Sequence, residues 1–231
     1  MTGPTSSFPL SGRTAVRWRV ALPGRHVTAV SVAPDGMCFV AAEHGLLALN
    51  GPEIRWSAEA VAAWGCLLLG DDLLVTAGVG GFVVRRQRTG SVVGTIEATP
   101  MSAPVPMADG LLVFLAAGSV LRATTLTGQP RWEAQVPARY PPLGWHGTVL
   151  VAERSAVRAF SPDGGQLWRV ELAGEVAGSL VGLPDGDVLV PVRGDDRIGY
   201  LVADRHGGLR AVPAHLPPGE LVVPLPATRR L

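Results

Sequence analysis

A tryptophan recurs at a nearly constant interval along this chain, and this periodicity constrains the fold more than any other feature. Tryptophan occupies positions 18, 56, 132 and 168 in short, similar segments. The interval from Trp56 to Trp132 is twice the interval from Trp18 to Trp56, and Gly94 stands at the vacant midpoint. A slightly shorter step leads to Trp168, and a slightly longer one leads to a sixth position near Ala211. A period of roughly 20–50 residues is typical of solenoids, propellers and other repeat arrays.

Each interval between these positions has the same predicted internal order. An apolar strand leads through a tight turn to a second strand, a loop leads to a third strand, and another turn leads to the strand that holds the tryptophan position. The predicted first strands include 27–32 and 180–183; the second strands are 37–42, 73–77, 111–116, 148–152 and 187–192; the third strands are 46–49, 82–86, 120–124, 156–160 and 198–202. The connecting turns contain Asp-Gly, Asn-Gly or Thr-Gly, which tolerate the positive φ angles of tight hairpins.

This pattern predicts an all-β fold, a small β-propeller of about five four-stranded blades with a possible rudimentary sixth. The 29 glycines and 20 prolines leave no helix-length apolar period. A four-stranded unit of about 40 residues is typical of a propeller blade. The rival all-β fold, a sandwich, would not require a tryptophan position at a fixed period. We expect residues 1–11 to be a disordered N-terminal segment and residues 12–231 to form one domain.

Two segments carry a resemblance to a known superfamily. Arg158-Ala-Phe-Ser-Pro-Asp-Gly-Gly-Gln-Leu-Trp168 and Thr127-Gly-Gln-Pro-Arg-Trp132 resemble the Ala-Leu-Asp…Gly…Trp blade motif of quinoprotein-like propellers. That superfamily includes pyrroloquinoline quinone dehydrogenases and the barrel-assembly lipoprotein of outer membranes. The resemblance covers about Thr14 to Pro213 and implies the fold. Trp-Asp repeat propellers are a weaker match, because no Gly-His…Trp-Asp pairing recurs.

The dehydrogenase activity of that superfamily does not carry over to this chain. Those enzymes resemble it in blade motif only, and they have eight blades, a vicinal Cys-Cys disulfide and Ca²⁺ ligands around the quinone. Cys38 and Cys66 lie far apart in the sequence and form no such vicinal pair. We therefore expect no cofactor, and we interpret both cysteines as buried, inert thiols in a reducing compartment.

Composition excludes several classes of function. Hydrophobic residues make up 47% of the chain and charged residues 17%, so it is globular, and its net charge of +1 with no basic stripe argues against nucleic acid as a partner. All 20 basic residues are arginine. The N-terminal segment lacks the regions of a signal peptide, and the longest apolar run, 60–70, is shorter than the roughly 20 residues of a membrane helix. We expect no membrane association, a cytoplasmic location and no role in barrel assembly.

Hairpin parity predicts where a functional site lies. The short turns between strands one and two and between three and four share one face, where we expect little room for a site. The longer loops between strands two and three, and between blades, share the other face, and loops on a rigid scaffold tend to carry binding residues. This loop-rich face should hold the candidate ligand- or partner-binding residues Arg25, His26, Glu43, His44, Trp64, Arg139, Tyr140, Glu153, Arg154, Arg193 and Asp195.

Three groups among these candidates have specific alternatives. His26 and His44, with Glu43, would suit a metal or an acid–base pair, but two histidines on different loops also occur by chance. Glu153 and Arg154 are interpreted as a solvated pair rather than a catalytic one. The loop 193–197, with Asp195, has adjacent carboxylates but lacks the spacing of a Ca²⁺ loop, so it is interpreted as a polar loop with no metal.

Two functional hypotheses remain open. The first is a non-catalytic interaction module that binds a protein partner or a small molecule through the loop-rich face at the channel mouth. The second is an enzyme of a specialised pathway, of the cyclase, isomerase or lyase type, with a small-molecule pocket at the channel mouth. A deep pocket with a buried, strongly shifted His or Glu would favour the enzyme, and a flat apolar patch with a polar rim would favour the module.

The N-terminal tryptophan position has no strands before it, which predicts how the ring closes. An open ring exposes a strand edge, so we expect residues 14–22 to return and pair with the last blade, built from residues 176–202. Residues 207–226 should then either pack outside that strand or begin a rudimentary sixth blade with Leu221–Leu225.

Overall fold

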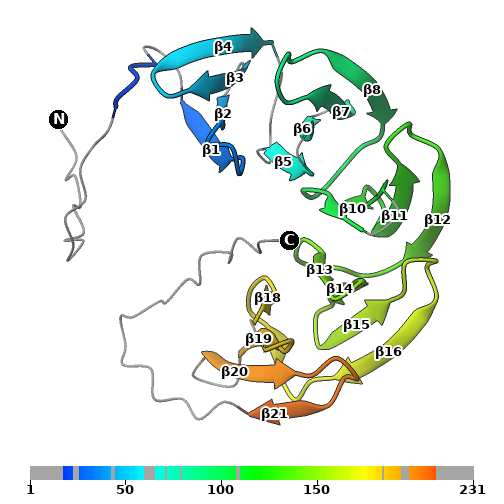
Figure 1. Cartoon of the computed structure of the whole chain (residues 1–231). Coiled ribbons are helices and arrows are strands. Elements are labelled where there is room, and N and C mark those ends of the chain that lie inside the picture. The colour runs from blue at the N-terminus through cyan, green and yellow to red at the C-terminus, as the bar shows by residue number, and fades with distance from the viewer. Residues whose placement is uncertain are drawn as a thin grey trace.

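Five separate antiparallel sheets follow one another along an arc around a common centre (Figure 1). The structure, a computed structural model, describes residues 18–22, 26–42, 45–59, 66–70, 72–78, 80–107, 110–183, 185–193 and 198–211. Within these ranges all regular secondary structure is β, and 21 strands are present. In the first four sheets each strand pairs with the next along the chain, so each of these sheets is the up-and-down meander of a propeller blade.

The blades are numbered here in chain order. Blade 1 contains β1 (Val27–Val32), β2 (Cys38–Ala42), β3 (Gly45–Asn50) and β4 (Glu53–Ala58). Blade 2 contains β5 (Cys66–Leu69), β6 (Leu73–Gly78), β7 (Gly81–Arg86) and β8 (Val92–Glu97). Blade 3 contains β9 (Val105–Pro106), β10 (Leu111–Ala116), β11 (Val120–Thr125) and β12 (Pro130–Gln135). Blade 4 contains β13 (Leu143–Trp145), β14 (Thr148–Ala152), β15 (Ala156–Phe160) and β16 (Gln166–Glu171).

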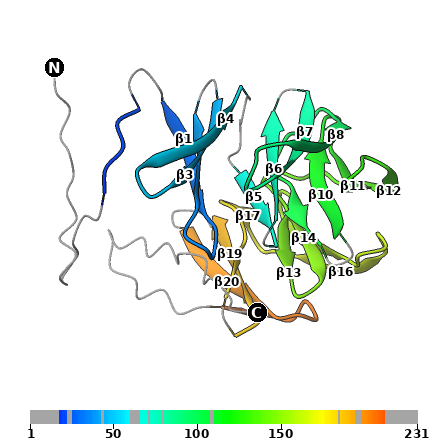
Figure 2. The same ribbon diagram turned by 45° about the horizontal axis from the view of Figure 1, so that its top comes forward.

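Blade 5 is the least regular. Its innermost strand is split into β17 (Glu175–Val176) and β18 (Val181–Gly182), which both pair with β19 (Val188–Arg193). β20 (Ile198–Ala203) and the short β21 (Leu209–Ala211) complete the sheet. In every blade the inner strands run along the central axis, whereas the outer strands are twisted towards the plane of the ring (Figure 1 and Figure 2).

The predicted strands agree with the structure. The predictions 27–32, 111–116, 148–152 and 156–160 match residue for residue, and the others shift by about one residue at one or both ends, as is usual for strand boundaries. The prediction of a small propeller with about five four-stranded blades is confirmed.

The recurring tryptophan is the contact between successive blades. In three blades its indole N–H donates to a backbone carbonyl in the turn between the third and fourth strands of the next blade, as in Trp132 to Pro162 at 2.7 Å, Trp56 to Gln87 at 2.7 Å and Trp168 to Arg205 at 3.2 Å. The ring lies on a glycine of the same turn: Gly90, Gly164 or Gly207. Each glycine has a positive φ, and a Cβ there would lie only 2.6–3.1 Å from the ring. The tryptophan and the turn glycine therefore require each other.

Gly94 replaces tryptophan in blade 2, as the spacing predicted, and the contact changes accordingly. A Cβ on Gly94 would lie 3.2 Å from the carbonyl oxygen of Leu126 in blade 3. The backbones of the two blades thus meet directly where an indole lies elsewhere. Nearer the axis, Phe82 and Phe114 meet edge to face with centroids 4.6 Å apart.

The hydrophobic core lies between the blades. Separate clusters of buried side chains join blade 1 to 2, 2 to 3, 3 to 4 and 4 to 5. Phe39, Phe82 and Phe114 are among the largest fully buried side chains. The arc is therefore held together by face-to-face packing of sheets, which agrees with the Trp contacts at its rim.

Ring closure differs from the prediction. The fourth strand of blade 5 is β21, which follows β20 through a turn capped by Asp204, whose carboxylate accepts from the N–H groups of His206 and Gly208. Trp18–Leu22 form no strand, and residues 14–17 lie outside the described ranges. The predicted pairing of residues 14–22 with the last blade is therefore wrong in its described part. A local hairpin costs far less loop-closure entropy than the return of a distant terminus.

We expect Trp132→Ala to destabilise the protein by about 2–3 kcal/mol. Trp56, Trp132 and Trp168 are half-buried, so the loss should fall below the roughly 3–5 kcal/mol of a fully buried tryptophan. Leu167→Ala is the matched control, because Leu167 is a large apolar residue of an outermost strand, like Trp132, but is 54% exposed. Urea unfolding should show a change within about 0.5 kcal/mol for the control. Equal effects of both substitutions would contradict the docking role of Trp132.

Candidate functional site

The junction of blades 4 and 5 gathers polar side chains on both faces of the ring. On the loop-rich face a hollow of about 350 Å³ is lined by Arg139, Tyr140, Glu175 and Arg193, with Val176 and Ala177. Loops between blades and between second and third strands contribute these side chains, as hairpin parity predicts. We call Arg139, Tyr140, Arg154, Glu175 and Arg193 the arginine cluster.

Glu175 is the centre of the arginine cluster. One carboxylate oxygen accepts from Nε of Arg154 at 2.6 Å, and the other accepts from Nη1 of Arg139 at 3.3 Å. The hydrogen bond from Arg154, followed in effect by the charge of that guanidinium and by Arg139, holds the pKa of Glu175 below its usual range. Arg193 pairs in register with Glu175 across β17 and β19 and is exposed. Two guanidinium groups thus bind the carboxylate, and a third arginine lies beside it in the sheet.

Backbone contacts fix the position of the arginine cluster. The N–H of Arg139 donates to the carbonyl of Ala152 at 3.0 Å, and the N–H of Val176 donates to the carbonyl of Arg154 at 2.8 Å. The hydroxyl of Tyr140 donates to the carbonyl of Val176 at 3.4 Å. The two bonds that involve Val176 connect blades 4 and 5, so the side chains project from a rigid base.

Glu153 does not pair with Arg154. Its side chain is buried, at 3% exposed, and Oε2 accepts from Nη2 of Arg169 at 2.9 Å and from Nε of the same residue at 3.2 Å. Nη2 of Arg158 lies 2.5 Å from Oε1. The interpretation of Glu153 and Arg154 as a solvated pair is therefore wrong. The carboxylate is buried and neutralised by arginines of β15 and β16, while Arg154 binds Glu175.

Of the other sequence candidates only His26 is described, and it does not join this cluster. His26 is described and exposed, and it precedes β1 in blade 1. Arg25, Glu43, His44, Trp64 and Asp195 lie outside the described residues, so the predicted pair of His26 and His44 stays a prediction. Within the described ranges no group of three or more His, Cys, Asp or Glu side chains is placed to hold a metal ion.

Cys38 and Cys66 are both free thiols and half-buried. Burial raises the pKa of the Cys66 thiol to about 11. The thiol is therefore protonated and slow to react at neutral pH, as the sequence suggested.

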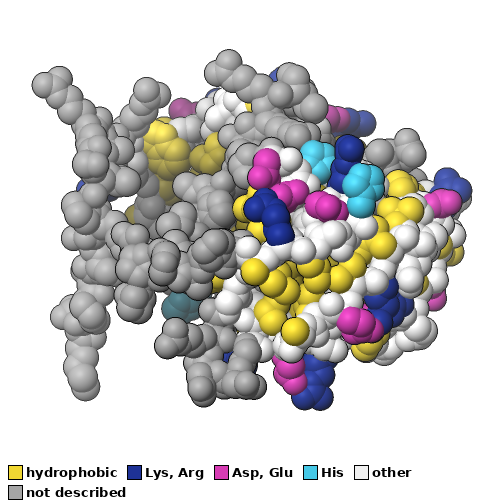
Figure 3. All heavy atoms as spheres, turned by 90° about the horizontal axis from the view of Figure 1, so that it is seen from below, with side chains coloured by type: hydrophobic (Ala, Val, Ile, Leu, Met, Phe, Trp, Pro, Cys, Tyr) yellow, Lys and Arg dark blue, Asp and Glu magenta, His cyan; other side chains and the backbone are white. Residues whose placement is uncertain are grey.

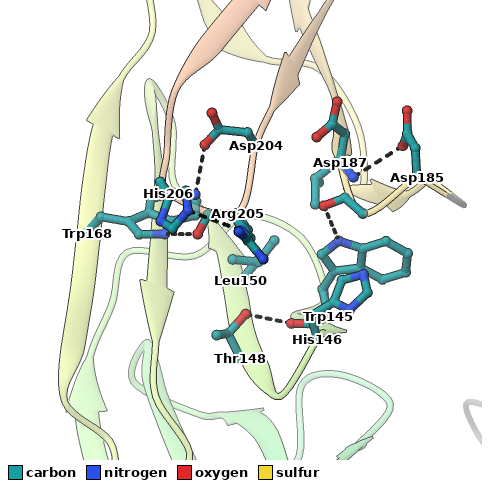
Figure 4. Close-up of a pocket in the computed structure, with 12 residues that line it drawn as sticks. Trp145, His146, Thr148, Leu150, Trp168, Asp185, Asp187, Asp204, Arg205 and His206 are labelled. Atoms are coloured by element: carbon teal, nitrogen blue, oxygen red, sulfur yellow. Dashed lines mark hydrogen bonds between the residues drawn. The ribbon is translucent and has the colours of Figure 1, made fainter.

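The turn face of the same junction holds a larger hollow that the sequence analysis missed. We call it the Trp145 pocket; its volume is about 650 Å³. Trp145, His146, Thr148, Leu150 and Trp168 line it from blade 4, and Asp185, Gly186, Asp187, Val188, Asp204, Arg205 and His206 line it from blade 5 (Figure 4). The expectation that the short turns leave little room for a site is therefore wrong.

Two indoles frame the Trp145 pocket. Trp168 donates to Arg205 at one side, and Nε1 of Trp145 donates to the carbonyl of Gly186 at 3.1 Å on the other (Figure 4). The ring of Trp145 lies on Gly182, where a Cβ would come within 2.4 Å of it. The two indoles bond to two different turns of blade 5, and both line the hollow. Trp145, a tryptophan outside the repeat positions, was the sequence signal for it.

Histidine and acidic side chains surround the mouth of the pocket, and such side chains gather on the surface that Figure 3 shows. His146 has a φ of 48°, a left-handed conformation that a non-glycine residue seldom adopts. Its ring meets that of Trp145 edge to face, with the ring centroids 4.6 Å apart. Nε of Arg205 donates to Nε2 of His206 at 3.1 Å. His146 and His206 are both exposed.

The comparisons with known proteins identify the fold alone. No family model matches the chain, and no curated protein matches it. BamB from Moraxella catarrhalis is similar in structure, with a TM-score of 0.56 and 14% identity over 78% of this chain and 57% of that one. The C-terminal WD40 domain of Sif2 gives a TM-score of 0.60 and 14% identity over 77% and 55%. A protein of unknown function from Bacteroides caccae gives 0.53 and 16% over 80% of each chain.

These similarities confirm a β-propeller. The chain spans little more than half the length of BamB and of the Sif2 domain. BBS1N in complex with ARL6DN is also similar, with a TM-score of 0.55 and 17% identity over 84% of this chain and 68% of that one. The part of the chain that the structure describes contains no helix suited to crossing a membrane.

Glu153→Ala should destabilise the protein by about 3 kcal/mol. It would remove the buried carboxylate that pairs with Arg158 and Arg169 and leave their charges without a partner there. Arg154→Ala is the control: Arg154 is the neighbouring residue, its side chain is 73% exposed and it pairs with Glu175 at the surface. We expect the control to change the free energy of unfolding by less than about 0.5 kcal/mol. Thermal and urea unfolding of both variants would measure this difference. A stable Glu153→Ala protein would show that the buried carboxylate is not structural.

Proposed function

We propose that this propeller is a non-catalytic binding module whose loop-rich face, at the arginine cluster, binds an acidic segment of a protein partner. The observation that carries this proposal is that two arginines bind one carboxylate while a third, exposed arginine lies beside it in the sheet, in a chain whose net charge is only +1. Arginine presents planar donors that match carboxylates in bidentate geometry.

The surroundings of the arginine cluster support a binding role. Glu175 holds Arg139 and Arg154 in place, and exposed Arg193 lies beside them, so the surface keeps an excess of positive charge after the internal pairs are counted. Because these side chains stand on backbone joined across two blades, little ordering is needed when a partner binds. The hollow of about 350 Å³ lies at the lower end of the size range of ligand sites, which suits a side chain of a partner.

The structural neighbours support a protein partner in general terms. One similar propeller is BBS1N in complex with ARL6DN, and another belongs to a mitotic checkpoint complex, with a TM-score of 0.63 and 12% identity over 83% of this chain and 65% of that one. We propose further that the blades are repeats of the quinoprotein-like type and that the module acts as a scaffold in the cytoplasm.

Replacing Arg139, Arg154 and Arg193 together by alanine should weaken binding of a fluorescein-labelled hexaglutamate peptide at least tenfold. Each guanidinium contributes a charge-assisted contact to a carboxylate. The matched control replaces Arg55, Arg88 and Arg131, three exposed arginines of blades 1, 2 and 3, and so removes the same charge. Fluorescence anisotropy at about 0.1 M salt would compare the two variants. If the two triple variants bind the peptide equally weakly, binding depends on the overall charge of the protein, and the arginine cluster is not a specific site.

The Trp145 pocket favours a second candidate function, that of an enzyme with a small-molecule substrate. Its volume lies in the range of ligand sites, and it places two imidazoles, three carboxylates and a guanidinium around two indoles. We propose this only as the alternative, because both indole N–H groups and Asp204 are already satisfied by backbone.

A small-molecule screen by thermal shift would test the alternative. A ligand of the Trp145 pocket should raise the Tm of the unmodified protein and lose most of this effect in His146→Ala and in His206→Ala. Arg154→Ala, on the opposite face, is the control and should keep the shift. If stabilising compounds raise the Tm of both histidine variants as much as that of the unmodified protein, this would count against an active site in this pocket.

A further inference from the structure

Blade 1 has a continuous apolar face that no described sheet covers. The strand register aligns Val32, Cys38, Leu49 and Ile54 in one row, and Val30, Val40 and Leu47 in the next. The alternate residues face blade 2, where Phe39, Leu46 and Ala48 join a cluster with Leu74. We call the two aligned rows the free face of blade 1.

The free face is only partly covered in the described structure. Val40, Leu47 and Leu49 form a small cluster of their own, and Leu22 packs against it. Val30 and Val32, on the innermost strand, remain 58% and 56% exposed. Valines at this position are the part of the face nearest the central axis, so the uncovered region is the inner half of a blade interface.

The other end of the arc has a matching apolar face. In blade 5, Val188, Val190 and Ala203 face blade 4. The alternate residues face the opposite side, where the register pairs Leu189 with Val202 and Pro191 with Tyr200. In Figure 1 the sheets of blades 1 and 5 lie at the two ends of the arc and do not meet. Two apolar sheet faces therefore border the position of a sixth blade.

The spacing of the repeat predicts which residues reach that position. The innermost strand of each blade begins a nearly constant step after the tryptophan position of the blade before it. The step runs from Trp56 to Cys66 at β5, from Gly94 to Val105 at β9 and from Trp132 to Leu143 at β13. In blade 5 the two pieces β17 and β18 begin on either side of the point that the same step from Trp168 would reach.

Ala211 is the corresponding position of blade 5. The N–H of Asp204 donates to the carbonyl of Gly208, which repeats in blade 5 the bond from Ser161 to Gly165 in blade 4. The shift that carries Ser161 to Asp204 also carries Trp168 to Ala211. The step observed at β5, β9 and β13 then leads from Ala211 to Leu221 or Val222, the start of the apolar segment Leu-Val-Val-Pro-Leu.

This segment resembles an innermost strand that the structure already contains. β9 includes Val105-Pro106 and is followed by Met107, and 221–225 ends in Val-Pro-Leu. Proline is tolerated in such a strand because an innermost strand is an edge strand of its blade. In the described blades, innermost strands of successive blades also lie beside each other: Ser31 of β1 donates to the carbonyl of Cys66 in β5 at 2.7 Å.

We propose that residues 221–225 of the same chain form the innermost strand of a sixth blade position, where they cover Val30 and Val32 of blade 1. The connection needs no unusual path, since it repeats the step by which the chain enters blades 2, 3 and 4. Burial of these valines would remove exposed apolar area from the innermost strand of blade 1, which favours the placement. The proposal is independent of the proposed binding function.

Disulfide trapping in the full chain tests this placement. With Cys38 and Cys66 replaced by serine, Val30→Cys is combined with Val222→Cys or with Val223→Cys, because one of two neighbouring strand residues should face β1. The control combines each C-terminal cysteine with Val92→Cys in β8, whose parent valine is 52% exposed. Oxidation is carried out at micromolar protein, and the products are separated without reductant.

The expected result is an intramolecular disulfide with Val30→Cys in at least one pair, at least tenfold more abundant than with Val92→Cys. Equal yields at the two positions would overturn the proposal. A second result would also overturn the proposal: a disulfide-linked dimer that forms with Val30→Cys and not with Val92→Cys. That result would assign the free face to a second copy of the chain. Val30 and Val92 are both surface positions, so neither cysteine should prevent folding.

Discussion

The contact between an indole and a turn glycine is the interaction on which the arrangement of blades depends. Trp56, Trp132 and Trp168 each donate their N–H to the carbonyl of a turn in the next blade and lie on the glycine of that turn. The hydrogen bond fixes direction and the flat contact fixes distance, so one residue per blade sets the step from sheet to sheet. Blade 2, which has Gly94 in place of tryptophan, shows what happens without an indole. The backbones of blades 2 and 3 meet directly, and the Phe82 and Phe114 rings supply the aromatic contact.

Sequence reasoning recovered the fold because its signals are local. Three signals each act within one repeat: turn glycines with positive φ, short apolar runs and the position of tryptophan. Together they predicted the strand boundaries to within about one residue. Closure of the ring was not predictable in this way. It depends on competition between two possible partners for β20, and a hairpin formed by the turn at Asp204 takes the place that was assigned to residues 14–22.

The candidate sites were predicted less well, for a related reason. Hairpin parity correctly brought Arg139, Tyr140 and Arg193 to one face. It does not say which arginine pairs with which carboxylate, and so Glu153 was assigned to its neighbour Arg154 instead of to Arg169, which lies across the sheet. The Trp145 pocket was not predicted, because it lies between a turn of blade 4 and two turns of blade 5. The spacing between turns of different blades is not encoded in any one turn.

Both candidate sites lie at the junction of blades 4 and 5, and the irregularity of blade 5 explains why. Its innermost strand is broken into β17 and β18, which pair separately with β19. Side-chain bonds hold the junction on both faces: Trp145 and Trp168 anchor it on the turn side, and Glu175 with Tyr140 anchors it on the loop side. Residues of the junction that have no such structural role are therefore the better indicators of function. Arg193 makes no ion pair among the described residues, and His146 keeps a left-handed backbone that asparagine or glycine would adopt at lower cost. A role outside the fold accounts for such residues better than a role within it.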